Sequence, residues 1–177
     1  PMRFALLLPL AALGLLLSGC AGYKIGPVQP KFMAEIHKIA IPTFRNDTLE
    51  PRVEVPLATA VIKQFQHDGT YQIVNEKDSD AILEGWLDTI QRRPARSVRG
   101  NILLTKEYTL TIRCRFKLTN RVTGLVIDER TVSGTTSFYA TGSDSVSQDV
   151  NQDERQAIPL AAEDMAVQLV SQYAEGW

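Results

Sequence analysis

The feature that most constrains the fold is a strict alternation of apolar and polar side chains between positions 108 and 118. In the run Tyr-Thr-Leu-Thr-Ile-Arg-Cys-Arg-Phe-Lys-Leu every second residue is apolar, and the residues between are threonine, arginine or lysine. A period of two is the period of a β-strand, in which successive side chains point to opposite faces of the sheet. The run therefore predicts a strand with one face in a core, which includes Cys114, and the other face in water.

The next segment predicts the partner of that strand. A turn over 120–124 separates the alternating run from a second strand-like segment over 125–136, and this order is typical of a β-hairpin. Taken as 105–120, the first arm would extend roughly 53 Å at about 3.3 Å per residue, well beyond a usual strand. A hairpin of that length is expected to twist strongly or to project beyond the elements packed on it.

Shorter elements precede the hairpin. Apolar residues predict short strands at 36–41 and 71–74 and a further strand at 81–90. Between them, 53–65 carries an apolar side chain at every fourth residue, as a helix with one buried face does. This helix is expected from about 50 to 66, with Pro56 either near its start or in an irregular first turn. The strand–helix–strand order predicts that strands 36–41 and 71–74 are parallel.

A second amphipathic helix is expected from about 153 to 173, after a Ser/Gly/Asp-rich loop at 137–150, and Pro159 indicates a separate or bent first turn. Two amphipathic helices and a sheet with one wet face predict a two-layer α/β (α+β) sandwich. Both helices would pack on one face of a mixed sheet of four to five strands that includes the long antiparallel hairpin. We expect one domain over 36–177.

The first twenty residues have the pattern of an export signal. A basic start at Arg3 precedes 14 mostly apolar residues, Phe4 to Leu17, which as a helix would span roughly 21 Å of a bilayer core of roughly 30 Å. Leu17-Ser18-Gly19-Cys20 matches the lipobox of bacterial lipoprotein precursors, in which a peptidase cuts before the cysteine. We therefore expect a signal peptide at 1–19, fatty acids on Cys20 and a lipidated tether over 20–35. An ordinary secretory signal that ends near a cysteine is the alternative.

Composition excludes some classes of protein. After cleavage, 157 residues follow Cys20, over 21–177, which suits one domain. Without Arg3, 18 basic residues stand against 20 acidic ones, so the mature net charge is −2, whereas a nucleic-acid-binding domain is usually strongly basic. Cys114 is the only cysteine after Cys20, so the mature domain cannot form an internal disulfide.

The titratable residues predict no catalytic or metal site. His37 and His67 lie in different elements, and no cysteine is spaced to join them at a zinc ion. The acidic run Glu76, Asp78 and Asp80 lacks the length, the central glycine and the distal glutamate of a calcium loop, so it is expected to form a turn. The chain contains no phosphate-binding loop and no nucleophile elbow. We expect no enzymatic activity, no metal and no cofactor.

One charged cluster stands out, composed of Arg92, Arg93, Arg96 and Arg99, with Lys106 nearby. The stretch 91–99 contains no acidic residue, although the chain as a whole is slightly acidic. Placed between two predicted strands, it would form a flexible basic tip at one end of the sheet. Arginine favours phosphate because its planar guanidinium can donate two hydrogen bonds at once. The cluster therefore predicts an anionic partner such as a phosphorylated lipid; a solvated loop without a ligand is the alternative.

Several segments together resemble the LPS-assembly lipoprotein family (LptE). They are Gly22-Tyr23 after the lipobox, the run His37–Thr48 (HKIAIPTFRNDT), Val53-Glu54, Asp68-Gly69 with Tyr71, and Ser79–Gly85 (SDAILEG), followed by the long strand 108–118 and the C-terminal helix. The resemblance covers nearly the whole mature chain. The Ile-Pro-Thr-Phe-x-Asn-x-Thr run is its most specific part.

The resemblance implies a lipoprotein at the periplasmic face of the outer membrane, which Ala21 also favours, since an aspartate there would often retain a lipoprotein in the inner membrane. It further implies a plug inside an outer-membrane β-barrel (LptD-like) that inserts lipopolysaccharide (LPS) into the outer leaflet, and LPS binding by basic residues at one end of the sheet. Here those residues fall within 92–106. A pilotin-type or other periplasmic adaptor lipoprotein, or an envelope hydrolase, is the competing interpretation.

Overall fold

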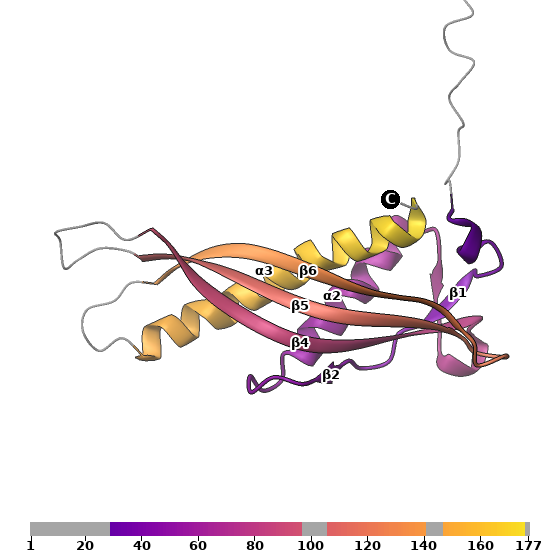
Figure 1. Ribbon diagram of the computed structural model, residues 1–177, viewed down its shortest axis with the longest axis horizontal. Coiled ribbons are helices and arrows are strands. Elements are labelled where there is room, and N and C mark those ends of the chain that lie inside the picture. The colour runs from indigo at the N-terminus through magenta and orange to yellow at the C-terminus, as the bar shows by residue number, and fades with distance from the viewer. Residues whose placement is uncertain (1–28, 97–105, 141–146, 176–177) are drawn as a thin grey trace, which may run out of the picture.

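Six strands form a single mixed sheet in the computed structural model, which describes residues 29–96, 106–140 and 147–175. Three long strands dominate it, and they lie side by side along the whole molecule (Figure 1). The strands are β1 (Lys38–Ala40), β2 (Arg45–Asn46), β3 (Gln72–Ile73), β4 (Ala81–Arg96), β5 (Lys106–Asn120) and β6 (Val126–Ala140). The sheet thus has one strand more than the sequence predicted, because the two-residue β2 carries no alternation that a pattern could reveal.

The order across the sheet is β3-β1-β4-β5-β6, with β2 also paired to β4. The short strands run parallel: β1 pairs with both β3 and β4, and β2 pairs with β4 farther along. Among the three long strands, β5 pairs antiparallel with both β4 and β6. The predicted parallel pairing of the first and third short segments and the predicted long hairpin are therefore both confirmed.

Two helices, α2 (Glu54–Asp68) and α3 (Ser147–Ala174), cover one face of this sheet. The helix α3 packs on β5 and β6, and α2 packs beside it. Pro56 is the third residue of α2, where its missing N–H would have no partner within the helix anyway. Two 3-10 turns, η2 (Lys31–Met33) and η3 (Glu76–Asp78), complete the fold. The two-layer α+β sandwich with both helices on one side is confirmed.

The core lies between the helices and the alternating strand. Leu110, Ile112, Cys114, Phe116 and Leu118 are all fully buried, as the period of two predicted. In β4 the pairing with β5 shifts by one residue between Leu87 and Thr89. This irregularity keeps Leu87 and Ile90 on the same face of the sheet although they are three residues apart, since Leu87 pairs with Cys114 and Ile90 with Ile112.

Gly134 sets the distance between β6 and α3. A Cβ atom at this position would lie 2.0 Å from the carbonyl oxygen of Ala161 and 2.6 Å from the backbone nitrogen of Met165. Only a residue without a side chain allows the strand to approach the helix so closely. Next to it, the backbone N–H of Thr135 donates a 2.8 Å hydrogen bond to the carboxylate of Asp164 on α3.

Three boundaries differ from the sequence expectation. The strand β4 continues to Arg96 instead of ending near Ile90, because β5 offers it pairing partners up to Glu107. The predicted loop 137–150 is partly strand and partly helix, with 141–146 outside the described residues. Pro159 lies inside α3, which begins at Ser147. The apolar residues Ala157, Ile158 and Ala161 are buried on both sides of it, so packing holds the helix together across the missing hydrogen bond.

The two ends of the sheet are different, and we call them the tether end and the basic end. The tether end contains residue 29, the start of β4 at Ala81 and the β5–β6 turn after Asn120; the basic end contains the end of β4 at Arg96 and the start of β5 at Lys106 (Figure 1). Residues 1–28, with the expected signal peptide and Cys20, lie outside the described residues. None of the described helices is both long enough and apolar enough to span a membrane.

Candidate functional site

The arginine segment is part of a strand, not a loop. Arg92, Arg93 and Arg96 belong to β4, and Lys106 begins β5; Arg99 lies outside the described residues. The sequence predicted a flexible tip from Arg92 onward. That prediction is wrong for the residues from Arg92 to Arg96, which belong to the strand. Because side chains alternate along a strand, Arg92 and Arg93 point to opposite faces of the sheet, and this difference decides what each of them can bind.

Arg92 faces the helices and is engaged in an ion pair. Its Nη1 lies 2.9 Å from a carboxylate oxygen of Glu154 on α3, and the Glu154 side chain is only 5% exposed. Burial raises the pKa of Glu154, the charge of Arg92 lowers it and the nearby Glu50 raises it further. Removing Arg92 would leave a buried carboxylate without its cation, which is costly. Arg92 therefore holds the start of α3 against the sheet.

Arg93 faces the open side of the sheet, which none of the described helices covers. Arg93 is exposed, and its guanidinium donates a hydrogen bond to Oε1 of Gln91. The donor–acceptor distance of 3.4 Å is near the upper limit for a hydrogen bond. Arg93 has no ion pair with any described residue. Its guanidinium is thus available to an anion from solution.

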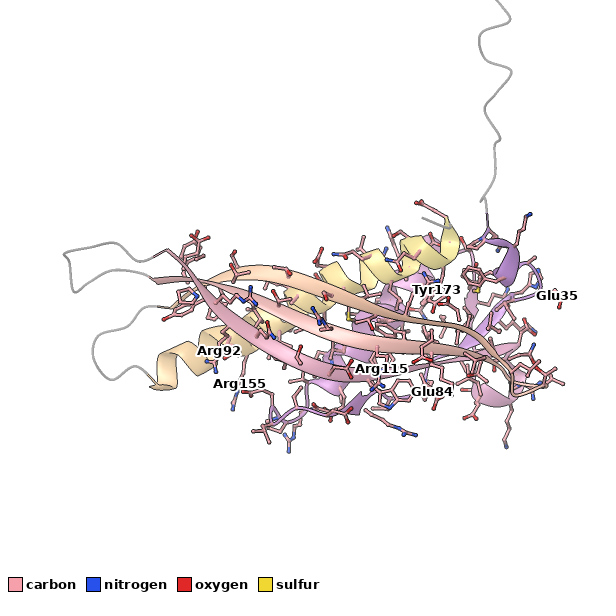
Figure 2. The ribbon with its side chains drawn as sticks, in the orientation of Figure 1. Glu35, Glu84, Arg92, Arg115, Arg155 and Tyr173 are labelled. Atoms are coloured by element: carbon pink, nitrogen blue, oxygen red, sulfur yellow. The ribbon has the colours of Figure 1, made fainter. Side chains whose placement is uncertain are left out.

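A cleft of about 330 Å³ lies beside the Arg92–Glu154 pair, between the segment before α2 and the first half of α3. Two arginines that have no ion pair with a described residue, Arg52 and Arg155, line it. Figure 2 shows Arg92 and Arg155 close to each other at this end of the molecule. The rest of the lining is Glu50, Pro51, Val53, Pro56, Ile158 and Pro159. The cleft therefore combines guanidinium groups with an apolar wall.

The sequence did not indicate Arg52 or Arg155 as members of this site. Each stands alone between acidic or apolar neighbours, in Glu50-Pro51-Arg52 and Asp153-Glu154-Arg155, and only the fold brings them together. The backbone of Arg52 has φ 64°, a left-handed conformation that non-glycine residues rarely adopt. No pattern in a single sequence predicts such a conformation at an arginine.

Two arginines in the middle of the open face, Arg45 and Arg115, differ from Arg93 because they are already engaged. Arg45 and Arg115 each lie 5.5 Å from the ring centroid of Trp86. Arg115 also contacts Asp88 at 3.2 Å and Asp47 at 4.0 Å. These contacts stabilise the short strand β2 against β4 and leave the arginines less free to bind a ligand.

The acidic residues near the tether end have structural roles. The carboxylate of Asp80 accepts hydrogen bonds from the backbone N–H groups of His37 and Lys38, at 3.0 and 2.8 Å. These hydrogen bonds lower the pKa of Asp80, and the bond from His37 has the larger effect.

The described residues contain no group of three or more potential metal ligands. The free cysteine, Cys114, is fully buried, and burial raises the pKa of its thiol to about 12.

Comparison with known proteins identifies one family. The model of the LptE family, described as lipopolysaccharide-assembly, matches residues 36–173. No curated protein sequence matches the chain.

Solved structures are similar in fold at low sequence identity. A neuraminyllactose-binding hemagglutinin homolog from Helicobacter pylori is 11% identical with a TM-score of 0.51, covering 87% of this chain and 93% of that one. A minor lipoprotein from Acinetobacter baumannii is 18% identical with a TM-score of 0.49, covering 78% and 91%. The PelC dodecamer of Paraburkholderia phytofirmans is 14% identical with a TM-score of 0.48, covering 83% and 93%.

Proposed function

This chain belongs to the LptE lipopolysaccharide-assembly family, and on that premise we propose that it is an outer-membrane lipoprotein that works by binding, not by catalysis. Fatty acids on Cys20 hold it at the periplasmic face. There it plugs and helps to assemble an outer-membrane β-barrel translocon and assists the insertion of LPS into the outer leaflet.

The observation that carries the LPS part of the proposal is the chemistry of the basic end. LPS presents phosphate groups next to acyl chains. In the cleft, the free guanidinium groups of Arg52 and Arg155 match the phosphates, and the apolar wall formed by Val53 and Ile158 matches the acyl chains. Arg93 offers a further free guanidinium group at the same end, on the opposite face of the sheet. Arg96 at the end of β4 and Lys106 at the start of β5 add positive charge at the same end of the sheet. We propose that Arg99, which lies between them in the sequence, contributes as well.

Arg92 has a different role in this proposal. Its ion pair with the buried Glu154 makes it a positioning residue that fixes α3 beside the cleft. A glutamate at position 92 would place two carboxylates together in a buried site and would disturb the fold. Binding experiments therefore need the exposed arginines.

The first experiment measures LPS binding of Arg93→Glu, Arg155→Glu and the double variant. Because a basic residue near an anionic surface contributes about 1 kcal/mol, the double variant should bind LPS at least about tenfold more weakly, with a smaller dependence on salt. The matched control is Arg113→Glu, since Arg113 is an exposed arginine on the open face away from this end and has no ion pair with a described residue. Losses in Arg93→Glu and Arg155→Glu that only equal the loss in this control would reduce the effect to net charge and contradict the site.

The second experiment identifies the partner. The lipid-anchored protein, captured from detergent-solubilised outer membrane, should bring down a large β-barrel protein. Recovery of a different envelope machine without any barrel would replace the translocon role by that of an adaptor or pilotin-type lipoprotein.

A further inference from the structure

The turn that joins β5 and β6 exposes three large apolar side chains within five residues. Val122 is 77% exposed, Leu125 69% and Val126 51%. No other stretch of five residues in the described ranges 29–96, 106–140 and 147–175 exposes three large apolar side chains. Single exposed apolar residues are normal on soluble proteins, whereas a group of them usually marks a contact surface.

This turn is rigidly built. The side-chain oxygen of Asn120 accepts hydrogen bonds from the backbone N–H groups of Val122 and Thr123, at 3.0 and 2.9 Å. The backbone N–H of Asn120 donates a further hydrogen bond to the carbonyl oxygen of Leu125, and Gly124 takes the left-handed φ of 70° that closes the turn. A turn held in this way presents its apolar side chains without an additional loss of chain entropy on binding.

Arg121 fastens the turn to the rest of the sheet. Its Nε donates a hydrogen bond to the carbonyl oxygen of Ser79, and its backbone N–H donates to the carbonyl oxygen of Asp80. The turn therefore cannot fold back to cover its own apolar residues. In addition, the segment 119–127 contains no acidic residue, so a negatively charged surface would not repel it.

The position of the turn indicates which surface it contacts. It lies at the tether end, the same end at which the described chain begins at residue 29 (Figure 1). Residue 29 is nine positions after Cys20, and even a fully extended chain spans only about 30 Å over nine Cα–Cα steps. If Cys20 carries fatty acids, this end of the domain must stay within that distance of the bilayer surface.

We propose that the apolar turn, formed by Val122, Leu125 and Val126, inserts into the surface of the lipid bilayer as a second membrane contact beside the acylated N-terminus. The inference rests on the lipid anchor of the proposed function. Two contacts at one end would fix the long axis of the sheet relative to the membrane and direct the basic end away from it. A lipid chain alone gives no such orientation.

The experiment places a spin label on the turn. Val122→Cys is made in the lipidated protein, which is reconstituted into phospholipid vesicles that contain neither LPS nor barrel. The remaining free cysteine, Cys114, is fully buried and stays unlabelled. Collisions of the label with oxygen, which concentrates in the bilayer, and with a water-soluble nickel complex report its depth. The matched control is Tyr139→Cys, which is 61% exposed near the opposite end of β6.

The label at 122 should gain oxygen collisions and lose nickel collisions relative to the label at 139. Adding Leu125→Asp should return the label at 122 to water. Equal nickel accessibility at the two positions would overturn the proposal, and so would protection of position 122 that arises only after the barrel protein is added. A protein that does not stay on the vesicles at all would refute the anchor and this proposal with it, whereas failure of the LPS or barrel role would not affect these measurements.

Discussion

The two ends of the sheet are stabilised in different ways, although the same three strands run through both. At the tether end, side chains bond to backbone groups: Asp80 to residues 37 and 38, Arg121 to Ser79, and Asn120 to its own turn. At the basic end, the contact that joins sheet and helix is a partly buried ion pair, Arg92–Glu154. The tether end is therefore rigid. At the basic end, Arg92 is engaged, whereas Arg52, Arg93 and Arg155 have no ion pair with a described residue.

This difference suggests a division of labour along the sheet. Regions that bind ligands are commonly drawn from the less stable parts of a fold, and the basic end, with exposed residues from 91 to 95, fits that description. The tether end contains the interlocked aromatic residues Phe32, Phe65, Tyr71 and Tyr173. We expect substitutions at the tether end to affect stability and substitutions at the basic end to affect binding.

The largest expected effect compares a tyrosine at each end. Tyr173 is fully buried, its hydroxyl donates to Asp128 at 3.1 Å, and the guanidinium of Arg130 lies 4.4 Å from its ring centroid. Tyr108 stacks on Phe138 but is only partly buried. Tyr173→Ala should lower the free energy of unfolding by about 4 kcal/mol, and Tyr108→Ala by about 1–2 kcal/mol. Urea unfolding of both variants measures the difference, and equal losses would show that the two ends are equally stable.

A smaller effect is expected at Asp80. Because its carboxylate accepts two backbone hydrogen bonds, Asp80→Asn should lower the free energy of unfolding by about 1 kcal/mol at neutral pH, the partial exposure of the carboxylate being allowed for. The neighbouring Asp78→Asn is the control, since Asp78 is exposed and has no ion pair with a described residue.

The pH dependence of the Asp80 effect has a definite sign. The folded-state pKa of Asp80 lies below its ordinary value of 3.8, so the folded state binds fewer protons than the unfolded state between these two values. The stabilisation is complete above about pH 4 and is lost as the pH falls through the folded-state pKa. The difference between wild type and Asp80→Asn should therefore shrink on acidification, and a difference that stays constant down to pH 2 would contradict the role of the charged carboxylate.

The same contrast explains what the sequence could predict. The alternation from Tyr108 to Leu118 is a local pattern, so strand β5, its buried face and the position of Cys114 could all be predicted. The continuation of β4 through Arg93 and Pro94 could not, because charged residues and a proline show no alternation and only pairing with β5 holds them in a strand.

The candidate site shows the same limit more strongly. Arg93 was found because it belongs to a run of arginines, but Arg52 and Arg155 are isolated in the sequence and meet only where α3 packs beside the segment before α2. The engagement of Arg92 with Glu154 was hidden as well, since 62 residues separate them in the sequence. A local charge count identifies the basic end of the sheet, whereas the fold decides which of its arginines remain free of other contacts.

The smallest expected effect is at the buried Glu154, where the pH dependence has the opposite sign. Burial raises its folded-state pKa above the ordinary value of 4.5, so its contribution to stability is complete below that pH and is lost as the pH rises through the folded-state pKa. Glu154→Gln removes the loss of stability that occurs when the buried carboxyl group ionises, but it also removes the ion-pair partner of Arg92. The two changes offset each other, and the net change at neutral pH should stay within about 1 kcal/mol.

Comparing Glu154→Gln with Glu163→Gln makes this test specific, because Glu163 is an exposed glutamate on the same helix. Relative to wild type, the Glu154 variant should become progressively more stable from pH 4 upward until the folded-state pKa is passed, while the Glu163 variant should show no such trend. Together with the Asp80 series, opposite slopes at the two ends would establish that one end of the sheet is stabilised by a charged carboxylate and the other is weakened by one. Slopes of the same sign would mean that the charge of Arg92 outweighs burial at Glu154, so that the ionised pair stabilises the basic end.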